Sequence, residues 1–176
     1  VEEISELMGL YGDNYSVVEI GIETGSPRLL SKYMPGKVKP FKISEWRDMV
    51  LHSAELLHSN NWLVCYSFIL GLPRETRDDV LKSLELVDEL RSYNCVIIPI
   101  IFMPAGALRK RGDFAFEQMT NEHWELFRRC MEQTLRKAPS FLKSDSLVKK
   151  IRNAFIRAFF YLGIIKMRRW KIGFET

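Results

Sequence analysis

Three nearly continuous apolar runs divide the first two thirds of the chain. They cover residues 16–22, 62–70 and 95–102, and β-branched and aromatic side chains are frequent in them. Short apolar runs of this composition predict strands, and the lack of polar alternation is typical of parallel sheets that are covered on both faces. The pattern therefore predicts three buried parallel strands.

Segments with helical spacing of apolar residues separate these runs. Ser26 followed by Pro27 is a strong helix start, and Thr76 with Asp79 three residues later forms a capping pattern. Helices are expected over four segments, residues 1–11, 27–34, 44–59 and 76–90. The third of these is expected to be capped by Ser44.

Alternating strands and helices predict an α/β fold with right-handed crossovers. Three parallel strands form a small sheet whose apolar edges need neighbours, so we expect part of a larger sheet or barrel. The fold expected for residues 1–110 is a partial (β/α) barrel of three parallel strands with helices. After Thr120 the pattern is helical only, so residues 111–176 are expected to form a helical C-terminal extension.

The composition is that of a soluble globular protein. The chain has 176 residues, of which 47% are hydrophobic and 27% charged, which argues against disorder and a disulfide scaffold. Three cysteines without a CxxC pair exclude a self-contained zinc or iron–sulfur motif and favour a reducing compartment, so we expect a cytoplasmic location. The sequence starts at Val1 without Met, from which we expect a processed chain or a piece of a longer one.

Charge is distributed unevenly. The net charge is +4, but residues 136–176 alone have a net charge of +9. The helix expected over residues 146–169 combines an apolar seam with basic flanks, which fits a helix lying in a membrane interface or one packed against the protein. Arg157 and Lys166 argue against a transmembrane helix. An anionic membrane surface is therefore a candidate partner, and a peripheral membrane location is an alternative; no specific nucleic acid is predicted.

Glycine and polar residues follow each predicted strand. Ligands of parallel α/β folds bind at the carboxyl ends of the strands, which here are residues 23–26, 71–76 and 103–106. Glycine lets a ligand approach the backbone, and the amides after Ser26 could bind an anion. Each turn alone is explained by turn and cap chemistry, but three such turns at strand ends favour a binding site.

The turns also resemble a known family. The segments GIETGSPRLLSKYMPGK, YSFILGLPRET and IPIIFMPAG are similar to the last three strand ends of radical S-adenosylmethionine (radical SAM) proteins, over residues 17–108. The residue pattern of these segments is most similar to that of archaeal members with a cobalamin-binding domain. In this family a CxxxCxxC loop binds a [4Fe–4S] cluster, and SAM is cleaved reductively to a 5′-deoxyadenosyl radical that abstracts hydrogen from a substrate.

The resemblance implies roles for individual residues. It places Glu23 at the ribose and amino-acid end of SAM, Ser67 at a ribose-binding position, and Ile69 beneath the adenine. Gly71 would allow the turn, and Lys37 would meet the SAM carboxylate. The full set of expected cofactor-binding residues is Glu23, Ser26, Lys37, Ser67, Ile69, Gly71, Met103 and Pro104.

The chain lacks the CxxxCxxC loop and the first half of the barrel. Cys65, Cys95 and Cys130 fall in predicted core positions, so no metal ligand and no catalytic residue is assigned, and this chain alone is predicted to be inactive. The full-length protein would bind SAM and a [4Fe–4S] cluster, with cobalamin as a further candidate and a lipid as one candidate substrate. The expected partner is the missing N-terminal half, or a second copy that covers the sheet edge.

Two other functions are compatible with the sequence. One is a non-catalytic half-barrel module that docks on a partner or a membrane surface. The other is an ordinary α/β-barrel hydrolase or isomerase, which needs an acid–base pair at the strand ends. Only Glu23 and Glu75 are available there for such a pair.

Overall fold

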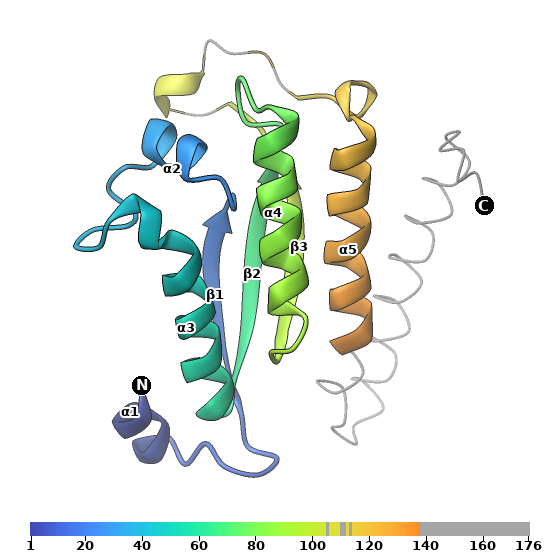
Figure 1. Ribbon diagram of the computed structural model, residues 1–176. Coiled ribbons are helices and arrows are strands. Elements are labelled where there is room, and N and C mark those ends of the chain that lie inside the picture. The colour runs from blue at the N-terminus through green and yellow to red at the C-terminus, as the bar shows by residue number, and fades with distance from the viewer. Residues whose placement is uncertain (105, 110–111, 113, 138–176) are drawn as a thin grey trace. The chain divides into compact units, whose positions relative to one another are not determined.

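The computed structural model describes residues 1–104, 106–109, 112 and 114–137. Three strands alternate with helices along the chain (Figure 1). The elements are α1 (Glu2–Leu7), β1 (Ser16–Glu23), α2 (Pro27–Tyr33), η1 (Ile43–Glu45), α3 (Trp46–Ser59), β2 (Trp62–Leu70), α4 (Arg77–Leu90), β3 (Cys95–Ile101), η2 (Gly106–Leu108), η3 (Phe116–Gln118) and α5 (Asn121–Lys137), where η marks a short 3₁₀ helix.

The strands form a parallel sheet in the order β1-β2-β3, which confirms the predicted α/β fold with three parallel strands. Ser67 in the central strand β2 lies between Gly21 of β1 and Ile98 of β3. The register of β1 against β2 shifts between Gly21 and Glu23, where the strand contains a bulge. Such bulges bend a strand and change the direction of a side chain near its end.

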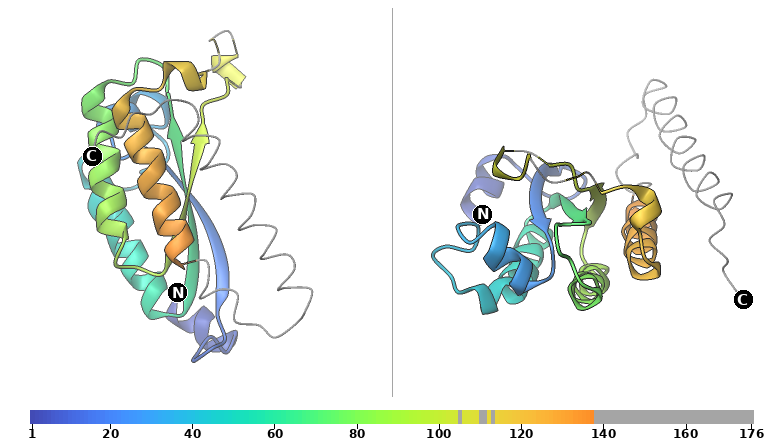
Figure 2. Two further views of the ribbon diagram at one scale, coloured as in Figure 1. Left: turned by 90° about the vertical axis from the view of Figure 1, so that its right-hand side faces the viewer. Right: turned by 90° about the horizontal axis from the view of Figure 1, so that it is seen from above.

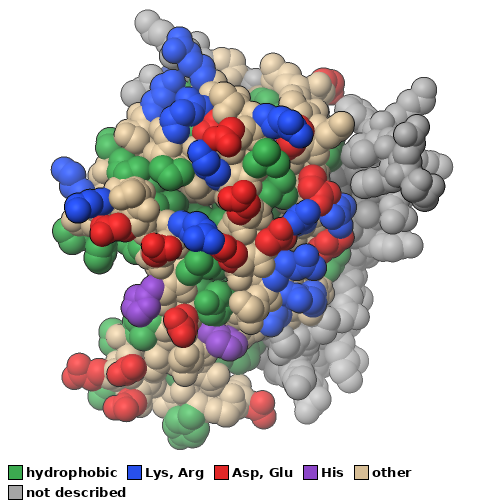
Figure 3. Space-filling view, viewed as in Figure 1, with side chains coloured by type: hydrophobic (Ala, Val, Ile, Leu, Met, Phe, Trp, Pro, Cys, Tyr) green, Lys and Arg blue, Asp and Glu red, His purple; other side chains and the backbone are tan. Residues whose placement is uncertain are grey.

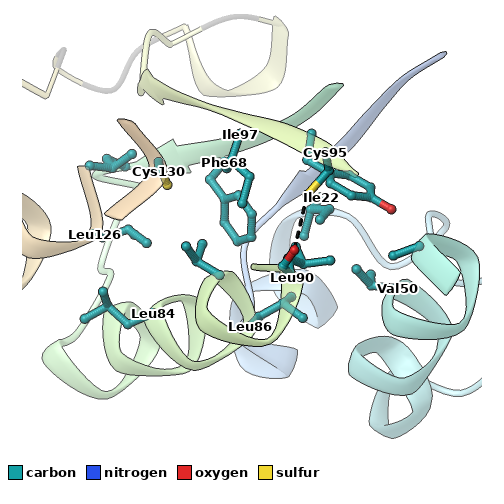
Figure 4. Packing of buried hydrophobic residues seen from close by; sticks show 14 of the residues in the cluster. Ile22, Val50, Phe68, Leu84, Leu86, Leu90, Cys95, Ile97, Leu126 and Cys130 are labelled. Atoms are coloured by element: carbon teal, nitrogen blue, oxygen red, sulfur yellow. Dashed lines mark hydrogen bonds between the residues drawn. The ribbon is translucent and has the colours of Figure 1, made fainter. Parts of the chain in front are cut away.

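Helices α3, α4 and α5 lie on the same side of the sheet (Figures 1 and 2). Sequential strand order with all crossover helices on one side is the arrangement of a singly wound sheet, which is also the arrangement in a barrel wall. The core lies between this sheet and the helices. Figure 4 shows Ile22, Phe68 and Ile97 of the three strands facing Leu86 and Leu90 of α4.

The other face of the sheet has exposed apolar side chains. Val17, Ile98 and Ile100 alternate along their strands with core residues, and they are 59%, 43% and 41% exposed. Strands that are apolar on both faces are typical of sheets that are covered twice. This second face therefore has the apolar composition of a surface that packs against another layer of protein.

Most helix starts are those that the sequence predicts. The hydroxyl of Ser26 accepts a bond from the Leu29 amide, and Thr76 and Asp79 form the predicted capping box of α4. The cap expected at Ser44 is wrong. Ser44 lies within η1, and α3 begins after Glu45 without a side-chain cap, because the chain enters the helix through a 3₁₀ turn.

Residues Val1–Lys137 form one compact unit, and the expected division after residue 110 lies within it. Helix α5 packs on β3 and α4, which places it in the same layer as the crossover helices. The helix expected over residues 146–169, with its basic flanks, lies outside the described residues. Among the helices of the described part, none is long and apolar enough to cross a membrane.

Charged side chains of both signs are mixed on the helical face (Figure 3). Arg47 of α3 pairs with Glu89 of α4, and Arg129 of α5 pairs with Asp88 of α4. Since these cations are paired and both signs are mixed over the face, it does not present the single-sign patch that favours binding to nucleic acid.

Candidate functional site

Glu23 and Lys37 form an ion pair at the carboxyl end of β1. The Lys37 Nζ donates to Oε1 of Glu23 at 2.8 Å. The Lys37 side chain is 29% exposed and the Glu23 side chain is 19% exposed. Glu23 has a φ of +69°, a left-handed conformation that is costly for a residue other than glycine. Such strain at a strand end is typical of functional positions, because the surrounding structure must maintain it.

The Glu23 carboxylate lies over Gly21. A Cβ atom built on Gly21 would come within 2.1 Å of Glu23 Oε1 and 3.1 Å of Lys37 Nζ. Gly21 pairs with Ser67, whose neighbours Tyr66 and Phe68 point into the helical core, so Gly21 and Ser67 belong to the second face of the sheet. The ion pair therefore lies above two small residues on that second face.

Ser67 and Ile69 lie on the same face of β2, because Tyr66, Phe68 and Leu70 between and beside them belong to the helical core. Ser67 is 7% exposed, and Ile69 is partly buried against the small cluster of Leu29, Leu72 and Phe102. Ile69 thus contributes to packing at the end of the sheet. Its position next to Ser67 on the same face is also the position that the resemblance assigns to the adenine contact.

Ser26 is not part of the surface around Glu23. Its side chain is fully buried, and its hydroxyl donates to Asp79 Oδ1 at 2.5 Å. The adjacent Gly25 lies against α4, where an added Cβ would come within 2.4 Å of the Lys82 carbonyl oxygen. The Thr24–Ser26 turn is therefore fixed to α4, and the Ser26 side chain is the helix cap that the sequence predicts. The cofactor contact expected at Ser26 stays a prediction.

Asp79 is the centre of this buried polar cluster. Burial alone would raise the pKa of its carboxyl, but hydrogen bonds from Arg28, Ser26 and Thr76 outweigh burial and hold the pKa well below its ordinary value. Arg28 also donates to the carbonyl of Arg74 at 2.8 Å. The cluster fixes the turn after β1 and the turn after β2 relative to each other.

Gly71 starts the turn after β2. It has a φ of +83°, and its amide donates to Glu75 Oε2 at 2.7 Å. A Cβ at this position would come within 2.0 Å of the Phe114 ring. Glycine is therefore required twice here, for the backbone conformation and for the approach of the ring.

Glu75 forms a second bond that the sequence did not reveal. Its Oε2 lies 2.9 Å from Nε2 of His123 in α5, and the side chains of Glu75 and His123 are 5% and 8% exposed. The Thr120 amide donates to His123 Nδ1 at 3.1 Å, which leaves the proton on Nε2, facing Glu75. A sequence signal was present, because Thr120 and His123 have the spacing of a capping box.

A cavity of about 280 Å³ lies beside this pair, at the ends of β2 and β3. Its apolar wall includes Leu72, Phe102 and Phe114, and Glu75 and His123 provide polar groups. The ring of Phe114 lies 5.2 Å from the ring of His123. This volume is near the lower end of the range for small-molecule sites, about 300 to 1,000 Å³.

Met103 and Pro104 follow β3 directly. Met103 is 76% exposed and Pro104 is half-buried. The amide of Phe102 donates to the Leu70 carbonyl at 2.9 Å, which continues the β2–β3 pairing one step past the strand. The exposed segment therefore begins directly after the last paired residue, at the same edge of the sheet as the Gly71 turn.

The cysteines do not form a metal site. Burial raises the pKa of Cys95 to about 11, and it also raises the pKa of Cys130 and of Cys65. Metal ligands are thiolates, which a raised pKa disfavours. Across the ranges that the structure describes, there is no group of three His, Cys, Asp or Glu side chains that could hold a metal ion.

The structure thus brings Glu23, Lys37 and Ser67 together, and it places Gly71 and Met103 at the same edge of the sheet. Glu75, in contrast, pairs with His123 and does not approach Glu23 as an acid–base partner. No protein-family model matches the sequence, and no curated protein matches it. The family implied by the strand-end motifs therefore stays a prediction.

Proposed function

We propose that this chain is the carboxyl-terminal half of a radical SAM barrel and that its strand ends bind the nucleoside part of SAM. The observation behind the proposal is the singly wound parallel sheet, with the motif-bearing turns at one edge. In barrels of this kind the second face lines the interior, and the carboxyl ends of the strands form the site.

The residues on the second face suit a nucleoside. Glu23 has two carboxylate oxygens, which is the acceptor arrangement that two neighbouring ribose hydroxyls require. Gly21 leaves the space that the Glu23 carboxylate occupies, and the small side chain of its neighbour Ser67 lets a ligand approach β2 beside that carboxylate. Ile69 offers an apolar contact for a base, and Lys37 can exchange its ion pair with Glu23 for one with the carboxylate of the ligand.

An iron–sulfur cluster does not fit the residues of this chain. Cys65 belongs to the second face, whereas Cys95 and Cys130 are buried in the helical core, and the two faces are separated by the sheet itself. The cluster of a radical SAM enzyme would therefore have to be bound by residues outside this chain. The contribution proposed for this half is to bind and orient the nucleoside.

A non-catalytic docking module is the second candidate. The exposed apolar residues Val17, Ile98 and Ile100 favour it, because they suit an interface as well as a barrel interior. The two candidates differ at the strand ends. A docking module needs no strained Glu23, whereas a nucleoside site does.

The experiment is SAM binding and 5′-deoxyadenosine formation by the gene product that contains this chain, after anaerobic iron–sulfur reconstitution. We expect Glu23→Gln to weaken SAM binding at least tenfold, because a charged acceptor of two hydroxyls is lost. Glu19→Gln on the same strand is the matched control and should leave binding unchanged. Absence of 5′-deoxyadenosine from the reconstituted protein would contradict the proposal.

The isolated chain offers a separate test. It should bind SAM weakly or not at all, because the described residues hold no set of ligands for the cluster that chelates SAM in this family. Micromolar binding of SAM in a calorimetric titration without iron would contradict the half-barrel assignment. Binding of anionic vesicles by the chain, and its loss on truncation before Ser146, would support the docking module.

A further inference from the structure

The cavity beside Glu75 and His123 lies apart from the Glu23–Lys37 pair and has its own polar groups. Glu75 is almost completely buried, yet both of its hydrogen bonds, from Gly71 and from His123, reach the same oxygen, Oε2. Among the described residues, Oε1 of Glu75 has no partner. Oε1 is not one of the fully buried atoms that lack a partner, so it is open to the cavity that Glu75 lines, where a ligand that supplies a hydrogen-bond donor can reach it.

Other acceptors around the cavity are already occupied. The carbonyl of Pro73 accepts a bond from the Tyr33 hydroxyl, and the carbonyl of Arg74 accepts one from Arg28. One donor to Glu75 is the Gly71 amide, and the other is Nε2 of His123, whose Nδ1 accepts a bond from the Thr120 amide. Among the described residues no Lys or Arg forms an ion pair with Glu75, and an ammonium group is the donor that would complete the carboxylate best.

Arg74 provides the opposite charge at the exposed side of the cavity. It is an exposed lining residue with a φ of +60°, and its guanidinium makes no hydrogen bond or ion pair with any residue that the structure describes. Its neighbour in the turn, Arg77, is paired with Glu122 and so does not compete for the same role. A free guanidinium binds a carboxylate well.

We propose that this cavity binds a small amino-acid-like zwitterion. The ammonium group of the ligand donates a hydrogen bond to Oε1 of Glu75, and its carboxylate pairs with the Arg74 guanidinium at the cavity mouth. An apolar side chain of the ligand packs against Leu72, Phe102 and Phe114. The inference is independent of the nucleoside site, because none of the residues at Glu23 takes part. It assigns the Glu75–His123 pair to ligand binding in addition to its support of the Gly71 turn.

Three probes of similar shape test the charge pattern. L-Leucine carries both charged groups, 3-methylbutylamine carries only the ammonium, and 4-methylpentanoate carries only the carboxylate. The full chain is titrated with each, and the amide signals of Gly71 and Phe114 are followed by NMR. We expect L-leucine to bind at least about tenfold more tightly than either single-charge probe, because each lacks one charged hydrogen bond.

Variants assign each charge to its residue. Glu75→Gln should remove the advantage of L-leucine over 4-methylpentanoate, and Arg74→Gln should remove its advantage over the amine. Arg77→Gln is the matched control and should leave all three affinities unchanged. If Glu75→Gln fails to fold, the probe series and Arg74→Gln still decide the matter.

Three results would overturn the proposal. The first is the absence of any saturable shift at Gly71 with L-leucine at millimolar concentration. The second is binding of 4-methylpentanoate as tight as that of L-leucine. The third is an unchanged L-leucine affinity in Arg74→Gln, which would mean that the Glu75–His123 pair only supports the turn.

Discussion

The hydroxyl of Ser26 donates a hydrogen bond to the buried carboxylate of Asp79, 53 positions later in the chain, at 2.5 Å. Ser26 is the N-cap of α2, and Asp79 is part of the capping box of α4, so one bond joins the starts of two helices. Since both helices begin directly after strand-end turns, this pair fixes the two turns that contain Glu23 and Gly71.

Asp79→Asn is expected to destabilise the protein by about 2 to 4 kcal/mol, because Arg28 loses its anionic partner and the amide cannot accept all the bonds of the carboxylate. Urea unfolding at pH 7 measures the change. Asp78→Asn is the control. The Asp78 side chain is 71% exposed and, in the described part of the chain, pairs with Lys82 on the helix surface, so its loss should leave the midpoint almost unchanged. Equal effects of the two substitutions would contradict the role of Asp79.

The contribution of Asp79 should depend on pH. Its folded pKa is held below the ordinary value of 3.8, so the ionised form stabilises the folded state. This contribution is fully present above the unfolded-state pKa and is lost as the pH falls toward the folded pKa. The difference in unfolding free energy between wild type and Asp79→Asn should therefore be constant from about pH 7 to pH 5 and shrink below about pH 4. A difference that grows on acidification would show that another group is responsible.

Glu23→Gly is expected to stabilise the fold while it removes nucleoside binding. Glycine relieves the strained φ of +69°, which should add up to about 1 kcal/mol, partly offset by the greater freedom of glycine in the unfolded chain. Thermal unfolding measures the gain, and SAM binding by the reconstituted gene product measures the loss.

Arg74→Gly is the control for backbone relief, because Arg74 has a φ of +60° but lies away from the Glu23–Lys37 pair. It should raise stability without affecting SAM. A loss of stability in Glu23→Gly would mean that the ion pair with Lys37 outweighs the strain.

The fold could be predicted from the sequence because its strong patterns are local. The run Trp62–Leu70 is apolar throughout and is bounded by turns, so its limits as a strand matched the structure. The capping pattern of Thr76 and Asp79 likewise predicted the start of α4. The cap predicted for α3, Ser44, lies one residue before the observed N-cap, Glu45, because a 3₁₀ turn precedes the α-helix.

The candidate site was less predictable because it depends on contacts between distant residues. Ser26 has the pattern of a helix cap, but the bond from its hydroxyl to Asp79 joins segments 53 positions apart, which no local pattern reveals. His123 has no metal-like spacing to the other histidines, so its sequence position suggests no special role, yet its partner is the carboxylate of Glu75, 48 positions earlier. Only the topology, which places the start of α5 over the end of β2, brings that pair together.

Gly71→Ala should be strongly destabilising, by about 2 kcal/mol or more. A methyl group would overlap the Phe114 ring, and alanine does not tolerate a φ of +83°. Gly36→Ala is the matched control, because no atom lies within 4 Å of the added Cβ and the backbone is not in the left-handed region. Chemical unfolding of both variants measures the difference. Phe114→Ala in the Gly71→Ala background should recover the steric part of the loss and leave the backbone part. Full recovery would show that Gly71 is required only for the approach of the ring, whereas no recovery would show that the turn conformation alone demands glycine.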